Sequence, residues 1–167
     1  MDIREIILKE HSKANCTFIV NWVGNNQYRF DKLFDLFIKD EYRVMQRAAW
    51  PLSYAVQNHP ALIRKHFGNL LKNLQKPGLP NAVKRNTFRL LQSVNIPKKY
   101  QGEVMNLCFE NIHSPTEKIA VKAFSLTILE RLAMLYPEIK QEVKTIIKDR
   151  LEFESPAFRA RAKKIQL

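Results

Sequence analysis

The sequence predicts an all-α fold, and three observations support this class. Apolar residues recur with the period of an α-helix along most of the chain of 167 residues. No stretch sustains the alternation of apolar and polar residues that a half-buried strand requires. Glycine occurs only four times, so the tight turns that join neighbouring strands would be hard to form. Helices are therefore the only regular elements that we expect.

Proline and helix-capping residues divide the chain into about ten helices. Proline is favoured in the first turn of a helix, and Ser, Asp and Asn are favoured immediately before the first turn. The boundary signals, in chain order, are Gly24-Asn25-Asn26, Asp40, His59-Pro60, Lys76 to Pro80, Ile96-Pro97, Ser114-Pro115, Tyr136-Pro137 and Ser155-Pro156. The expected helices cover residues 2–10, 12–24, 27–39, 41–58, 60–75, 81–95, 97–113, 115–136, 137–152 and 155–166.

One of these helices contains a proline in its interior. Pro51 lies within helix 41–58, where its missing backbone N–H removes a helical hydrogen bond. We expect this helix to kink at Pro51 or to divide into two.

The ten helices form five pairs, and the second helix of each pair begins in a similar way. Its candidate caps are Ser12, Asp40, Asn81, Ser114 and Ser155, which are 28, 41, 33 and 41 residues apart. Helix pairs that repeat at such a period indicate an α-solenoid, in which neighbouring pairs stack because one pair cannot bury its apolar face alone. We expect a single domain over residues 1–167, a right-handed α-solenoid of about five antiparallel helix pairs, with approximate repeats 2–24, 27–58, 60–95, 97–136 and 137–166.

Three segments resemble the second helix of a HEAT repeat. The stretch SPTEKIAVKAFSLTILERL, from Ser114 to Leu132, carries a polar cap, a Val-cation pair, a small residue and several leucines. YRVMQRAAWPL and NAVKRNTFRLL are looser versions of the same pattern. The resemblance covers most of the chain and implies a HEAT/armadillo-like stack whose second helices line the concave surface.

The charge of the chain is strongly and unevenly positive. Twenty-eight Lys and Arg residues face sixteen acids, which gives a net charge of +12. Residues 1–40 are neutral, residues 41–115 carry eleven cations and three acids, and residues 116–167 carry eleven cations and seven acids. Such a field attracts polyanions, and nucleic acid is the commonest large polyanion in a cell.

Cations recur four and eight residues after Asn81, Ser114 and Ser155, and the same pattern, shifted by one residue, follows Asp40. Spacings of four, four and three residues keep these side chains on one face of a helix, where like charges repel unless a partner relieves them. We call this set the basic stripe: Arg43, Arg47, Trp50 and Tyr54; Arg85, Arg89 and Gln92; Lys118, Lys122 and Ser125; Arg159, Lys163 and Gln166. In the first repeat the same places hold Cys16, Val20 and Val23, so we expect that repeat to cap the stack and to lie outside the binding groove.

These features predict a non-enzymatic binding module with a basic concave surface. Nucleic acid, DNA or RNA, held through its phosphates and with little sequence preference, is the partner that we expect first. Trp50 and Tyr54, which neighbour Arg43 and Arg47, either stack on exposed bases or lie in the core. The alternative partner is an acidic protein segment, for which the chain would be an interaction scaffold.

The resemblance extends distantly to HEAT-like DNA alkylation repair proteins. Alkylpurine DNA glycosylases of that kind combine a basic concave surface with an aspartate and aromatic residues at the lesion site. Here the expected helix 81–95 contains no acid, and Trp50 is followed one turn later by Tyr54. The resemblance therefore implies glycosylase activity only as a remote alternative.

No cofactor or metal is expected. Cys16 and Cys108 lack the spacing of a metal-ligand pair, and the four histidines are scattered. Unpaired cysteines are typical of a reducing compartment, which favours the cytoplasm. The N-terminal residues lack the long apolar run of a signal peptide, and no apolar run approaches the roughly 18 residues of a membrane span.

Overall fold

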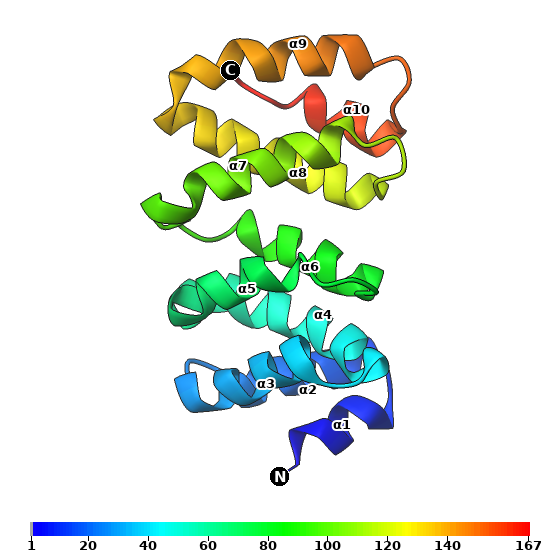
Figure 1. Ribbon diagram of the computed structural model, residues 1–167. Helices are drawn as coiled ribbons and strands as arrows, with labels where there is room; N and C mark the ends of the chain where they lie inside the picture. The colour runs from blue at the N-terminus through cyan, green and yellow to red at the C-terminus, as the bar shows by residue number, and fades with distance from the viewer. Residues whose placement is uncertain (1) are drawn as a thin grey trace. The chain divides into compact units, whose positions relative to one another are not determined.

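The computed structural model describes residues 2–167, and this part of the chain is all-helical (Figure 1). Ten α-helices and two short 3₁₀-helices follow one another, without a strand among the described residues. The all-α class is therefore confirmed. The chain divides into two compact units, Met1–Asn95 and Ile96–Leu167, which we call unit 1 and unit 2. The boundary falls between the third and fourth expected repeats, and a single stack over residues 1–167 stays a prediction.

Unit 1 is built around one central helix, α4. Its elements are α1 (Ile3–Lys9), α2 (Lys13–Val23), α3 (Gln27–Lys39), α4 (Tyr42–Asn58), the 3₁₀-helix η1 (Pro60–His66), α5 (Phe67–Asn73) and α6 (Asn81–Leu91). Helix α4 packs against α1, α2, α3, η1 and α6. Its core face includes Val44, Ala48, Leu52 and Val56, which are fully buried and repeat every four residues as one face of a helix does.

Unit 2 has α8 in the same central position. Its elements are α7 (Lys98–His113), α8 (Ile119–Leu135), the 3₁₀-helix η2 (Pro137–Ile139), α9 (Lys140–Arg150) and α10 (Pro156–Ala162). Helix α8 packs against α7, η2, α9 and α10. Leu126, Leu129 and Ala133 are among its fully buried residues.

Second helices of neighbouring repeats lie against one another inside each unit. In unit 1, α4 contacts both α2 and α6, and in unit 2, α8 contacts α10. Three second helices also pack on the first helix of their own pair: α2 on α1, α4 on α3 and α8 on α7 (Figure 1). This arrangement is the stacking of helix pairs that the sequence predicts.

Two of the five expected caps are confirmed. The Ser12 hydroxyl accepts a hydrogen bond from the backbone N–H of Asn15 at 3.0 Å, and the Ser155 hydroxyl accepts one from Phe158 at 3.2 Å. Both satisfy a donor in the first turn of a helix that would otherwise lack a partner.

The other three caps are wrong. Asp40 binds the guanidinium of Arg4 with both carboxylate oxygens, and Glu41 is the residue that precedes α4. Asn81 is itself the first residue of α6, after Pro80. Ser114 ends α7, and a turn separates it from the start of α8 at Ile119.

Three helices differ from the sequence prediction in their helix type or continuity. The helix expected over residues 60–75 is η1 followed by α5, and the helix expected over residues 137–152 begins as η2. Both start with tight 3₁₀ turns, which are common at the N-termini of α-helices. Helix α4 is not divided at Pro51, because most helical stability in proteins comes from tertiary packing and α4 has five packing neighbours.

Candidate binding surface

Aromatic and basic side chains meet where α4 and α6 lie side by side in unit 1. Tyr54 on α4 is 37% exposed, and the guanidinium carbon of Arg89 on α6 lies 5.3 Å from the centroid of its ring. Trp50, one helical turn before Tyr54, is half-buried, and the two ring centroids are 6.4 Å apart. We call Trp50, Tyr54 and Arg89 the aromatic–basic row.

A groove lies between this row and α2. Its volume is about 380 Å³, and Trp50 and Tyr54 contribute to its α4 side. The remaining lining residues are Lys13, Cys16, Thr17, Val20 and Asn21 of α2 and Asn58 of α4. We call this space the α2–α4 groove. It combines two aromatic rings with three polar side chains and one ammonium group.

Arg89 also acts electrostatically on the groove. Cys16 is buried, and burial raises the pKa of its thiol to about 11, whereas the positive charge of Arg89 acts in the opposite direction. The thiol is therefore neutral at pH 7 and lacks the reactivity of a thiolate.

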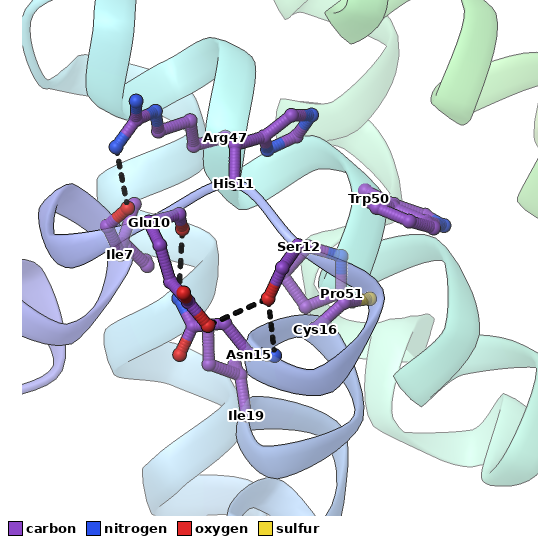
Figure 2. Close-up of a pocket in the computed structure, with 10 residues that line it drawn as sticks. All are labelled: Ile7, Glu10, His11, Ser12, Asn15, Cys16, Ile19, Arg47, Trp50 and Pro51. Atoms are coloured by element: carbon purple, nitrogen blue, oxygen red, sulfur yellow. Dashed lines mark hydrogen bonds between the residues drawn. The ribbon is translucent and has the colours of Figure 1, made fainter.

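Arg47 has a role within the fold, in contrast to its expected place in the exposed stripe. Its Nη1 donates to the carbonyl of Leu8 at 2.7 Å and to that of Ile7 at 3.3 Å, in the last turn of α1. Figure 2 shows the bond to Ile7. A cation at the C-terminal end of a helix satisfies carbonyls that lack helical partners. The half-buried side chain of Arg47 is therefore committed to α1.

The same region fixes one side of Trp50. The ring of His11, in the link between α1 and α2, meets the ring of Trp50 edge to face at a centroid distance of 5.5 Å. Figure 2 shows His11 beside Arg47, and Ser12 near the start of α2. The Asn15 amide donates to the carbonyl of Glu10 at 2.9 Å and so ties α2 to this link. The Trp50 ring thus contacts His11 and also lines the α2–α4 groove.

Arg43 and Arg85 are the exposed cations of the stripe in unit 1. Neither side chain has a hydrogen-bond or ion-pair partner among residues 2–167. No acid occurs between Glu41 and Glu103, and none occurs in α2, so α2, α4 and α6 carry no carboxylate. Nothing on these helices neutralises the arginines.

In unit 2, Lys122 was expected on the exposed basic stripe, but it is buried. It is 5% exposed, and its Nζ lies 2.7 Å from the Glu154 carboxylate, which Arg150 also binds at 2.7 Å. Burial favours the neutral form of Glu154, but the hydrogen bonds from Lys122 and Arg150 outweigh burial and lower its pKa. Lys122 is therefore one partner of a buried ion pair and faces no ligand.

The other cations expected in unit 2 are exposed. Lys118 directly precedes α8, and Arg159 and Lys163 lie in and just after α10; no side-chain partner is found for these three within the described chain. Of the polar residues in the stripe, Ser125 is buried and bonded to Asn111. Gln92 is half-buried, and Gln166 is exposed.

The first repeat contributes to the surface, although the sequence pattern assigned it to a cap. Cys16 and Val20 line the α2–α4 groove together with Trp50 and Tyr54. Their offsets from Ser12 are those of the cations in later repeats, so the pattern identified the correct face of α2. Lys13 and Asn21 supply polar groups to the same groove from neighbouring positions, and the role of the first repeat as a cap stays a prediction.

Other chemistry has less support in the structure. Within residues 2–167 no group of three His, Cys, Asp or Glu side chains is placed to hold a metal ion. No helix in the described part of the chain is long and apolar enough to cross a membrane. The α2–α4 groove has no carboxylate among its lining residues, so it lacks the acid that glycosylase chemistry uses.

The family comparison agrees with the helix-pair architecture. A family model described as HEAT repeat domain matches residues 3–166. No curated protein and no solved structure shows significant similarity to the chain. The match spans nearly the whole chain and both units, and second helices pack side by side within each unit. The chain belongs to the HEAT repeat domain family.

Proposed function

We propose that the chain is a nucleic-acid-binding module that holds phosphates on its second helices. One observation carries this proposal: the chain has eleven cations and no acid between Glu41 and Glu103, and in unit 1 that segment supplies the adjacent helices α4 and α6. Helical repeat proteins bind partners along surfaces formed by successive repeats.

The exposed arginines of α4 and α6 are the phosphate contacts that we propose. The side chains of Arg43 and Arg85 have no partners in the described chain. Arg89 lies over the Tyr54 ring, and no acid on α4 or α6 compensates its charge. Binding of phosphates would relieve the repulsion between these cations and release counterions from the nucleic acid. In unit 2, Lys118, Arg159 and Lys163 are the corresponding exposed cations.

An acidic protein segment is the second candidate partner. Unit 2 exposes large apolar side chains, with Phe153 85%, Met134 70% and Leu135 62% exposed, and such side chains favour contact with protein. Nucleic acid is favoured because α4 and α6 contain cations and no acid, and because Tyr54 of α4 lies beside Arg89 of α6, a combination suited to phosphates and bases together.

The test compares two charge-matched double variants. Arg43→Ala/Arg85→Ala removes two exposed cations from α4 and α6, whereas Arg64→Ala/Lys72→Ala removes two exposed cations from η1 and α5. Binding of a fluorescent single-stranded oligonucleotide is measured by anisotropy over a range of salt concentrations. A lost phosphate contact on single strands lowers the log–log salt slope by about 0.7, so the first variant should lose about 1.4.

The control variant should keep the wild-type slope. Equal losses in both variants would show that net charge alone attracts the oligonucleotide, and the proposed surface would be wrong. Absence of binding by the wild-type chain at low salt, together with binding of an acidic peptide, would replace nucleic acid by the protein partner.

A further inference from the structure

The α2–α4 groove offers a place for something larger than a phosphate. We propose that it takes one unpaired nucleobase, stacked on Trp50 or Tyr54, so that the chain prefers single-stranded nucleic acid to a duplex. This inference rests on the proposed function and names the form of nucleic acid that the surface recognises.

The size and composition of the groove fit a base. Its volume of about 380 Å³ lies within the range of roughly 300–1,000 Å³ that is usual for sites of small organic ligands. Two aromatic side chains contribute to its α4 side, and a base stacked on an aromatic ring gains binding energy whatever its sequence. A paired base in a duplex is stacked between its neighbours and cannot enter.

Unused polar groups surround this space. Thr17, Asn21 and Asn58 line the groove, and their side chains have no hydrogen-bond partner among the described residues. Amide and hydroxyl groups of this kind can bond to the edge of an unpaired base, whichever base it is. Because these side chains include both hydrogen-bond donors and acceptors, the groove is suited to bases in general.

One cation in the groove and one beside it suit the phosphates that flank such a base. Lys13 belongs to its α2 side, and its ammonium is unpaired in the described chain. Arg89 of α6 lies over the ring of Tyr54, which lines the α4 side. A single strand with one base inserted would keep its neighbouring phosphates near these two charges.

The experiment uses three ligands of equal phosphate number: a single strand, the same strand with abasic sites, and a duplex. Stacking is worth a factor of roughly 5 to 150 per base, so the intact strand should bind more tightly than the abasic strand by at least the lower value. The duplex should resemble the abasic strand. This comparison needs no variant and uses the chain as it is.

Tryptophan fluorescence locates the base. The chain has two tryptophans, so Trp22→Phe leaves Trp50 as the only one, and the intact strand should quench its emission while the abasic strand should not. Tyr54→Ala should abolish most of the preference for the intact strand. Tyr28→Ala, which removes a 68% exposed tyrosine from α3, is the matched control and should preserve the preference.

The outcomes separate this inference from the proposed function. Equal affinity for all three ligands with unchanged Trp50 emission would overturn base insertion and leave phosphate binding intact. Failure of all three ligands to bind would overturn both. A preference for the intact strand that survives Tyr54→Ala, without quenching of Trp50, would place the base elsewhere and overturn the inference.

Discussion

The guanidinium carbon of Arg89 on α6 lies 5.3 Å from the ring centroid of Tyr54 on α4. Next to Tyr54 in the sequence, the Ser53 hydroxyl lies 3.1 Å from the side-chain oxygen of Asn86, and both residues are fully buried or nearly so. Two contacts, one on the surface and one in the core, therefore join the same pair of second helices. Because they share this interface, the candidate surface and the packing of unit 1 depend on the same helix register.

Replacement of Arg89 should have a small effect on stability. A cation over an aromatic ring at an exposed site contributes about 0.5–1 kcal/mol, so Arg89→Ala should lower the free energy of unfolding by that amount. Urea unfolding measures this change. Arg85→Ala, one turn earlier on α6 and without a partner, is the control and should stay within about 0.5 kcal/mol of the wild type. Equal losses in the two variants would contradict a specific contact with Tyr54.

The buried cluster of unit 2 should respond asymmetrically. Glu154→Ala leaves the buried ammonium of Lys122 without its counter-charge, and such a break costs about 3–5 kcal/mol. Lys122→Met should cost less, because Glu154 keeps its bond to Arg150. Urea unfolding of the two single variants and of the double variant gives the comparison. The double variant should be less destabilised than the sum of the singles, and additive losses would argue against a direct pair.

Asp31 should make unit 1 sensitive to acid. Burial favours its neutral form, but hydrogen bonds from Lys65 and His66, both at 2.6 Å, and from Gln27 outweigh burial and lower its pKa from 3.8 to about 2. A carboxylate with a lowered folded-state pKa contributes stability that is fully present above its unfolded pKa. That contribution is therefore lost as the pH falls from about 4 through 2.

The variant Asp31→Asn tests this pH dependence. Its free energy of unfolding should fall less than that of the wild type between pH 5 and pH 2. Asp35→Asn is the control, since Asp35 lies one turn later on α3 and pairs only with exposed Lys39. Parallel pH profiles for the wild type and Asp31→Asn would show that the cluster around Asp31 contributes nothing to acid stability.

The two Ser-Pro sequences should differ when their serines are replaced. Ser155 bonds to the backbone of Phe158 at the start of α10, so Ser155→Ala should cost about 1 kcal/mol. Ser114 follows α7 and bonds only to the Thr116 hydroxyl, so Ser114→Ala should stay within about 0.5 kcal/mol of the wild type. Thermal or urea unfolding resolves the difference. A cost at Ser114 equal to that at Ser155 would contradict the observed start of α8.

Local sequence signals predicted some of these features and missed others. Ser12 and Ser155 cap helices because each hydroxyl reaches a backbone N–H three residues later, a contact that short-range sequence contains. Asp40 has the same local chemistry, yet Arg4, 36 residues away, binds its carboxylate. A side chain that binds a strong distant partner does not cap the helix, and no local sequence pattern reveals that partner.

The sequence by itself determined the helical class, the pairing of helices and the face of each second helix on which the cations lie. Spacing of three and four residues is a property of the chain, so Arg43 and Arg47 share one face of α4, and Arg85 and Arg89 share one face of α6, whatever surrounds them. Only the tertiary structure decided which cations remain exposed. Lys118 is exposed, whereas Lys122 is buried, because its ammonium pairs with Glu154, 32 residues later, in the turn between α9 and α10. The α2–α4 groove has the same origin, since its two sides come from different repeats.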